Sequence, residues 1–412
     1  MEPAHTENLT QLFRDVDEYV NSRFDAWVAC RRHLHANPEL SWQETATTRF
    51  LKQQLEQLEL TLEPGPRGMG GFVNLSSPDA EGRLIAYRGD IDAIPVEEET
   101  GREFCSRVQG VMHACGHDVH ATVAFGVCDT VQQLLQRGSP SFPVNLRVLF
   151  QPAEEVAQGA SEMIAIGALE GVESIMAMHV DASRDVGCVG FRDGVQTACS
   201  EEIRVHFHGE GGHSARPHET ADPLFAAAQF INAAYASVPR ITDSRVPEVL
   251  TFCHIAGGQY PNVIPSDVTL RGTLRTFDEA ARQQILTHLN QIGEASGQVT
   301  GVQVSVELGG YSPSVVNAPV INQLLVDSAN SFLEPGSITE VEPSLGGEDF
   351  AFYQQKVPGS LLRVGTAGSD FGRAHLHSPH FDVDEDVIRV AVSLFTRSIL
   401  NWAAATPQDV HP

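Results

Sequence analysis

The stretch "VMHACGHDVHA" (residues 111–121) concentrates side chains that bind metals or attack carbonyl carbon. His113, Cys115, His117, Asp118 and His120 all fall within eight positions. Such a cluster fits a metal site, a cysteine nucleophile with a histidine base, or a polar helix start capped by the aspartate. The glycine between the cysteine and the second histidine allows a tight turn, so both side chains can face one site. The stretch alone leaves all three interpretations open.

Other polar residues follow short apolar runs that we expect to be strands. "RGDIDAIP" places Asp92 after the run 83–88, "FQPAEE" places Glu154 and Glu155 after 144–150, and His179 ends the run 172–180. Near the C-terminus "AHLHSPHFD" adds three histidines, among them His377. Ligands of open α/β sheets sit beyond the carboxyl ends of the strands, so these residues are expected to converge at one sheet edge.

The mixture of ligand types favours a transition metal. Sulfur, imidazole and carboxylate together suit Zn²⁺, Mn²⁺, Co²⁺ or Ni²⁺ better than Ca²⁺ or Mg²⁺, which prefer oxygen alone. Of two adjacent carboxylates such as Glu154 and Glu155, one can bind metal while the other accepts a proton from the attacking water. This division of roles is what metal-assisted hydrolysis requires.

Each motif also has a plainer interpretation. A glutamate pair is commonly a solvated turn, and a histidine at a strand end is commonly hydrogen-bonded structure. The cysteine-nucleophile alternative would use Cys115 with His117 or His120 as base and Asp118 to orient it. It leaves four residues without a role: Glu154, Glu155, His179 and His377. The metal interpretation uses all of these groups.

The hydrophobic pattern predicts an α/β domain interrupted by a second domain. Two amphipathic helices open the chain, over residues 9–27 and 46–58, and strands then alternate with helices to about residue 180. From about residue 200 the predicted order becomes β-α-β-β-α-β, which is typical of a ferredoxin-like sandwich. Its expected elements are 203–208, 222–238, 248–256, 267–276, 278–296 and 302–308. We therefore expect segments 1–197 and 313–412 to form one domain and segment 198–312 to be inserted into it.

The composition of the chain limits which binding partners and which cellular compartment are expected. The chain of 412 residues carries 27 Lys and Arg against 53 Asp and Glu, a net charge of -26, and it has no polybasic run. Nucleic acid and anionic membranes are therefore poor candidate partners. The N-terminus lacks a signal-peptide pattern, no apolar stretch approaches about 18 residues, and the seven cysteines show no CxxC spacing. We expect a cytoplasmic protein with reduced thiols.

Taken together, the motifs resemble the aminoacylase-like family of dinuclear metallopeptidases, in its amidohydrolase branch of N-acyl-amino-acid, hippurate and auxin-conjugate hydrolases. The strings that carry the resemblance extend from about residue 25 to about residue 400 in the family's order. They are "RRHLHANPELSWQE", "RGDIDAIPVEEETG", "MHACGHDVHA", "FQPAEEVAQGA", "GEGGHSARPHETADP", "NVIPSDVTLRGTLRTF", "GGEDFAFY" and "LHSPHFDVDED". The resemblance implies a zinc-peptidase-like α/β catalytic domain with an inserted ferredoxin-like lid that dimerises. "FQPAEEVAQGA" departs from the family by lacking the "GGA" that often follows the glutamate pair.

The resemblance also implies roles for individual residues of the catalytic domain. Two divalent transition-metal ions per chain would be bound by five ligands, with the cysteine in the place of a bridging carboxylate. These ligands are Cys115, His117, Glu155, His179 and His377. Glu154 would be the general base, and Asp92 would accept a hydrogen bond from a liganding imidazole. Glu348 and Asp349 would have supporting roles.

In the lid, the resemblance implies residues that contact substrate. His213 corresponds to a histidine that reaches the partner subunit's active site and stabilises the oxyanion, so a homodimer is expected. Asn262 and Arg275 correspond to positions that hold the carboxylate of the amino-acid product. The expected reaction is hydrolysis of an N-acyl-L-amino acid or a similar small amide. A dipeptidase or deacetylase using the same site, and a non-catalytic binding protein, are the alternatives.

Overall fold

The computed structural model describes residues 3–77 and 83–405, which form two compact units. The first unit comprises the chain up to Gln196, Val315–Glu342, and the chain from Asp349 onward. The second comprises Thr197–Ser314 and Pro343–Glu348. The expected inserted segment was 198–312, so residues 343–348, which the sequence pattern assigned to the catalytic domain, group with the second unit instead. In this short segment the chain passes from the first unit back to the second, and its sequence has no periodic pattern that could have predicted this.

An eight-stranded sheet forms the centre of the first unit. Strands β3, β4, β5 and β16 run parallel, and β2 is antiparallel to β4. Strand β3 is buried along nearly its whole length. Parallel strands covered on both faces have such burial, and their sequences are therefore nearly continuous apolar runs. In sheet order the strands are β1 (Glu63–Pro64), β2 (Gly71–Ser76), β4 (Asn145–Gln151), β3 (Leu84–Asp90), β5 (Val172–Asp185), β16 (Gly359–Ala367), β6 (Val189–Phe191) and β15 (Ile338–Glu340).

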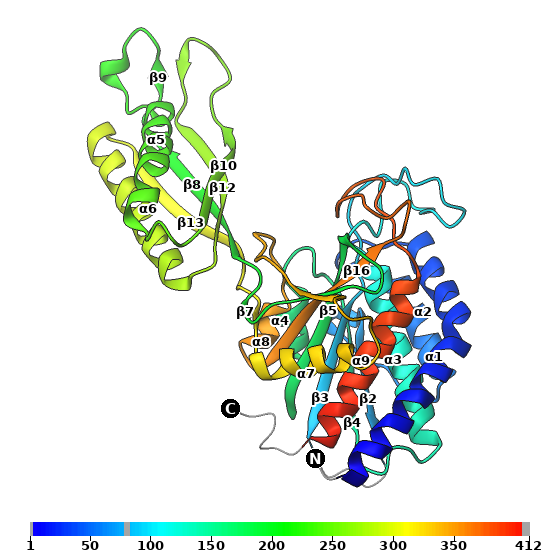
Figure 1. Ribbon diagram of the computed structural model, residues 1–412. Helices are drawn as coiled ribbons and strands as arrows, with labels where there is room; N and C mark the ends of the chain where they lie inside the picture. The colour runs from blue at the N-terminus through cyan, green and yellow to red at the C-terminus, as the bar shows by residue number, and fades with distance from the viewer. Residues whose placement is uncertain (1–2, 78–82, 406–412) are drawn as a thin grey trace. The chain divides into compact units, whose positions relative to one another are not determined.

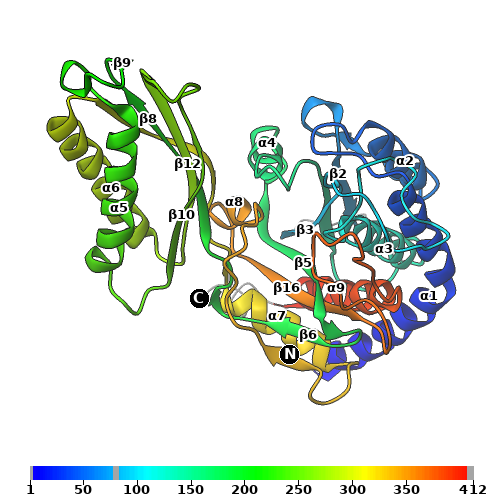
Figure 2. The same cartoon turned by 90° about the horizontal axis from the view of Figure 1, so that it is seen from above.

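Helices cover both faces of this sheet, and each face has its own hydrophobic core (Figures 1 and 2). The larger core is built mainly from α1 (Pro3–Ala36), α2 (Thr45–Glu56), α3 (His117–Gln136), α7 (Pro319–Asn330) and α9 (Asp386–Ala404). The smaller core, on the other face, involves α4 (Gly159–Ala165) and α8 (Ala351–Gln354). Short elements complete the unit: η1 (Pro66–Gly68) and the pair β7 (Gly194–Val195) and β14 (Val316–Asn317).

Helix α9 is long and apolar enough by composition to cross a membrane, although the sequence showed no uninterrupted apolar stretch of that length. It is 72% buried inside the first unit, where it contacts α1, α3 and α7. Its apolar character is therefore accounted for by its position in the core.

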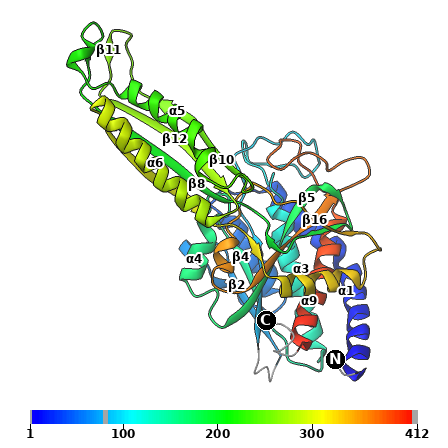
Figure 3. The ribbon, with the colours of Figure 1, turned by 60° about the vertical axis from the view of Figure 1, so that its left-hand side comes forward.

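The second unit is a four-stranded antiparallel sheet with two helices on one face (Figure 3). The β-α-β-β-α-β order predicted from the sequence is confirmed. Side chains capping both helices explain where they begin, since Asp222 accepts from the amides of Leu224 and Phe225, and Asp278 from that of Ala281. In chain order the elements are β8 (Cys199–His208), β9 (Gly212–His213), η2 (Pro217–Glu219), α5 (Pro223–Ile241), β10 (Glu248–Ala256), β11 (Val263–Ile264), β12 (Asp267–Thr276), α6 (Glu279–Thr300) and β13 (Gln303–Ser312).

One close approach between α3 and β3 depends on a glycine. A Cβ atom added to Gly89 would lie 2.6 Å from the carbonyl oxygen of His120 and 3.0 Å from the Cβ of Ala124. The helix that begins at His117 can therefore lie directly against the strand that leads to Asp92.

We predict that Gly89→Ala lowers the free energy of unfolding by about 1–3 kcal/mol, because the extra methyl group forces α3 away from the sheet. Urea denaturation followed by circular dichroism measures this change. Gly310→Ala is the control, since a Cβ added there meets no atom within 4 Å. An equal, small effect of both substitutions would contradict the prediction.

Candidate metal centre

The five predicted ligands come from four separate segments of the first unit. Four of them lie outside the strands, whereas His179, which the sequence pattern placed at a strand end, lies within β5, because this strand continues to Asp185. Cys115 lies in the turn before α3, His117 is the first residue of α3, and His179 lies in β5. Glu155 follows β4, and His377 lies in the loop between β16 and α9, with a φ of 65°.

Their ligand atoms form two overlapping groups. Cys115, His117 and His179 offer three ligand atoms within 4.8 Å of one another, and so do Cys115, Glu155 and His377. The cysteine sulfur is common to both groups. The structure thus brings together every residue of the predicted ligand set, in an arrangement suited to two ions.

Two buried atoms of this cluster have no hydrogen-bond partner among the described residues: Nε2 of His117 and Oε1 of Glu155. They lie 3.8 Å from each other. Leaving a buried polar atom unpaired costs about 1–3 kcal/mol, so native proteins rarely do it without a reason. Side chains that point unpaired lone pairs into one small space fit a bound cation.

Hydrogen bonds at the other ring nitrogen orient two of the imidazoles. Nδ1 of His117 is 3.2 Å from Oδ1 of Asp92, and Nδ1 of His179 is 2.8 Å from the carbonyl oxygen of Val180. In each case Nδ1 is the donor, which leaves Nε2 as the nitrogen that faces the cluster. This is the usual outer hydrogen bond of a liganding histidine.

The protonation equilibria reflect burial and the neighbouring charges. Burial, followed by the charge of Glu155, raises the pKa of the Cys115 thiol to about 12. Burial and the Arg363 guanidinium hold the pKa of His179 well below its ordinary value, so this ring is neutral. Burial opposes the charged form of His117, but Asp90, Cys115 and Asp92 outweigh it and raise the pKa of this ring well above its ordinary value.

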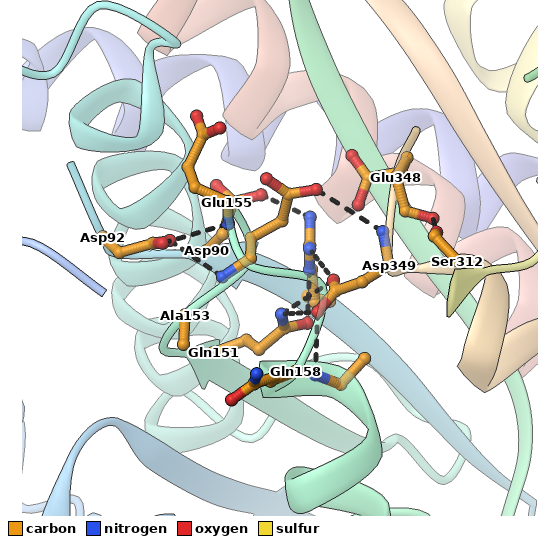
Figure 4. Close-up of polar contacts among 12 residues, drawn as sticks. Asp90, Asp92, Gln151, Ala153, Glu155, Gln158, Ser312, Glu348 and Asp349 are labelled. Atoms are coloured by element: carbon orange, nitrogen blue, oxygen red, sulfur yellow. Dashed lines mark hydrogen bonds and ion pairs between the residues drawn. The ribbon is translucent and has the colours of Figure 1, made fainter. Parts of the chain in front are cut away.

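Asp92 organises the turn that carries the two glutamates. Its Oδ1 accepts from the amide of Glu154 and its Oδ2 from the amide of Glu155, both at 3.1 Å (Figure 4). It also accepts from the Ser41 hydroxyl at 2.7 Å. With the bond to His117, this single buried carboxylate fixes a ligand and the glutamate turn together.

Glu154 has a carboxylate close to the ligand cluster. Its Oε2 lies 3.9 Å from Nε2 of His117, and its Oε1 accepts from the backbone amide of Asp349 at 3.4 Å. The Asp349 side chain is held by Arg88 at 2.9 Å and by Gln151 at 2.8 and 2.9 Å, in the buried group visible in Figure 4. The supporting position expected for Asp349 is consistent with these contacts.

The remaining histidines of the opening motif have other surroundings. His120 uses both ring nitrogens, with Nδ1 2.6 Å from Oδ1 of Asp90 and Nε2 accepting from the amide of Val180 at 3.0 Å. His113 is buried, burial lowers its pKa to about 4, and neither of its nitrogens has a partner among the described residues. Asp118 accepts from Nε of Arg31 at 2.7 Å and is 2.8 Å from Nδ1 of His35.

The three residues predicted to contact substrate belong to the second unit and are not part of this cluster. His213 is exposed on β9, where its Nδ1 accepts from the amide of Ala215 at 3.1 Å. Asn262 is exposed, and its backbone carbonyl oxygen accepts from the amide of Ser214 at 3.2 Å. Arg275, on β12, donates to the carbonyl oxygen of Leu345 at 2.5 Å.

The sequence interpretation missed two groups that support the centre. Arg88 is fully buried and joins Asp90, Gln151 and Asp349; an arginine inside an apolar strand pattern was the available signal. Glu44 is also fully buried and accepts from the amide of Ala153 at 2.8 Å. Nothing in its local pattern separates it from a surface glutamate.

Comparison with known proteins agrees with this geometry. The model of peptidase family M20/M25/M40 matches residues 86–401. A probable hydrolase of Synechocystis is 39% identical over 91% of this chain and 94% of its own length. The N-acetyl-L-cysteine deacetylase of Bacillus subtilis is 36% identical over 88% of this chain and 84% of its own length.

A solved structure gives the same result at the level of the fold. The YxeP protein of Bacillus subtilis, described as a dinuclear metal-binding peptidase of the M20 family, superposes with a TM-score of 0.78 at 32% identity. The match covers 92% of this chain and 98% of that protein. The chain therefore belongs to peptidase family M20/M25/M40, which confirms the resemblance, the fold class and the expected kind of enzyme, a metal-dependent amidohydrolase.

Proposed function

We propose that this enzyme hydrolyses the amide bond of N-acyl-L-amino acids, using two divalent transition-metal ions held by Cys115, His117, Glu155, His179 and His377. The observation that carries the proposal is a pair of buried atoms, Nε2 of His117 and Oε1 of Glu155, which lie beside the cysteine sulfur and have no hydrogen-bond partner in the part of the chain that the structure describes. The deacetylase among the relatives supports the acyl-amino-acid substrate class. A dipeptidase that uses the same site is the second candidate.

In the proposed mechanism Glu154 moves the proton. When bound, the ions would supply activation of water and polarisation of the amide carbonyl. Glu154, 3.9 Å from the ligand nitrogen of His117, accepts a proton from the attacking water and delivers it to the leaving amine. Asp92 keeps the His117 ring in the required tautomer and holds the backbone that presents Glu154.

We further propose that the second unit supplies the substrate contacts and joins two chains into a dimer. Strand β10 is at an edge of its sheet, and apolar side chains are exposed nearby: Phe225 at 51%, Ile255 at 51% and Tyr260 at 66%. Exposed apolar groups beside a free strand edge support association with another copy. His213 would then stabilise the oxyanion in the partner's site, and Asn262 and Arg275 would hold the substrate carboxylate.

A cytoplasmic location is proposed from the seven free cysteines.

The first test concerns metal and substrate. We expect purified enzyme to contain up to two transition ions per chain, and exhaustive chelation to abolish activity, with recovery on adding Mn²⁺, Zn²⁺, Co²⁺ or Ni²⁺. A panel of N-acetyl-L-cysteine, N-acetyl-L-methionine, N-benzoylglycine and dipeptides, assayed by release of free amine, measures it. Activity that survives complete removal of metal would overturn the metal assignment, and cleavage of dipeptides alone would favour the second candidate.

The second test concerns the base. Glu154→Gln keeps the shape of the side chain but cannot accept the proton, so kcat should fall roughly 10²-fold or more while bound metal is retained. The matched control is Glu162→Gln, because Glu162 lies close in sequence and is half-exposed in an ion pair with Arg67. Near-normal turnover in Glu154→Gln, measured on the best substrate of the panel, would remove the base role from this residue.

The third test concerns the dimer. If His213 acts across subunits, mixing inactive His213→Ala and Glu154→Gln chains should restore about a quarter of the wild-type rate, because half of randomly formed dimers are mixed and each has one intact site. Light scattering checks that the mixed species is a dimer. No recovery after confirmed exchange of subunits would place His213 within its own chain's site or outside catalysis.

A further inference from the structure

The turn that carries Glu154 and Glu155 is held in an unfavourable backbone conformation. Ala153, directly before the pair, has a φ of 54° and is fully buried. The left-handed region costs a residue with a Cβ roughly 1–2 kcal/mol, and such strain persists only where the surroundings impose it. The imposing contacts are therefore part of what aims the two glutamates.

One of these contacts comes from Glu44, at the start of α2. Its Oε1 accepts from the amide of Ala153 at 2.8 Å, while its Oε2 is buried and has no hydrogen-bond partner among the described residues. Glu44 is fully buried, so folding bears the cost of desolvating this carboxyl group, and burial raises its pKa to about 7. A surface position would avoid that cost.

Glu44 stands at the N-cap position of α2, where a side chain would ordinarily turn back to its own helix. It makes no such contact. Glu39 takes that role, because its carboxylate accepts from the amides of Ala46 at 3.1 Å and Thr47 at 2.7 Å. The Glu44 side chain is thereby available to reach Ala153.

Neighbours of Glu44 contact the same turn. The Ser41 hydroxyl donates to Asp92, which holds the amides of Glu154 and Glu155, and the Trp42 indole donates to Oε1 of Gln158 at 2.9 Å. Three successive amides, those of residues 153–155, thus donate to two buried carboxylates, Glu44 and Asp92. Of these three amides, that of Ala153, whose backbone is strained, donates to Glu44, while the carbonyl oxygen of Ala153 accepts from the amides of Gln158 and Gly159.

We propose that Glu44 is a positioning residue that holds Ala153 in its left-handed conformation and thereby aims Glu154 at the reacting atoms. The proposal rests on the proposed function, since it assigns Glu44 an effect on turnover through Glu154. Glu44 would act through the Ala153 backbone and not by contact with the substrate.

The experiment compares variants of the full-length, metal-loaded enzyme on the best substrate of the panel. Glu44→Ala should lower kcat about tenfold or more with KM and bound metal little changed, because a small displacement of a catalytic group is costly. Glu44→Gln should retain most of kcat, since its amide oxygen can still accept from Ala153. Adding Ala153→Gly to Glu44→Ala should recover kcat several-fold, because glycine adopts the left-handed conformation freely.

Two comparisons separate positioning from general stability. Glu39→Ala breaks a carboxylate–amide contact in the same segment without touching the turn, so it should lower the melting temperature but leave kcat unchanged. In a Glu154→Gln background, Glu44→Ala should cost little further, because both changes act on one step. If Glu44→Ala does not fold, Glu44→Asp replaces it, since that carboxylate is one methylene too short to reach Ala153.

Three outcomes would overturn the inference: unchanged kcat in the Glu44 variant, an equal loss in Glu39→Ala, or no recovery with Ala153→Gly. Failure of the proposed function has a different signature, namely near-normal kcat in Glu154→Gln.

Discussion

The carboxylate of Asp92 is the contact on which the rest of the centre depends. It accepts from the Ser41 hydroxyl, the His117 ring and the amides of Glu154 and Glu155, so it joins the segment before α2, the start of α3 and the turn after β4. A buried carboxylate is stable only when donors surround it, and these donors belong to the residues that must be placed. The hydrogen bonds that stabilise the buried Asp92 charge are therefore the same ones that position the residues of the site.

A second buried network supports the centre from the neighbouring strands. Arg88 joins Asp90 to Asp349, and Asp90 in turn contacts the His120 ring. The Arg88 and His117 charges outweigh burial and keep the pKa of Asp90 well below its ordinary value, so the group remains ionised in the interior. Removing one partner of such a network would leave an uncompensated buried charge, so the residues behind the ligands depend on one another.

Much of this arrangement could be predicted because the informative residues directly follow apolar runs, although His179 lies within β5 and not at its end. Asp92, Glu154 and His179 each follow a continuous apolar run, and parallel strands bring such positions together. Glu44 and residues 343–348 could not be predicted in this way. The role of Glu44 depends on one hydrogen bond to a residue distant in sequence, and residues 343–348 are a short segment that passes back to the second unit. Neither feature produces a periodic pattern in the sequence. Likewise, β6 and β15 have three residues each, too few for alternation to appear.

The position of β16 in the first sheet has a consequence for biosynthesis. This strand, residues 359–367, lies between β5 and β6, and the loop after it carries His377. A ribosome must therefore release the chain beyond His377 before the sheet can close and the last proposed ligand can arrive. Until then, the thiol of Cys115 and the His117 ring lack the neighbours that bury them, so metal acquisition and completion of the fold are expected to coincide.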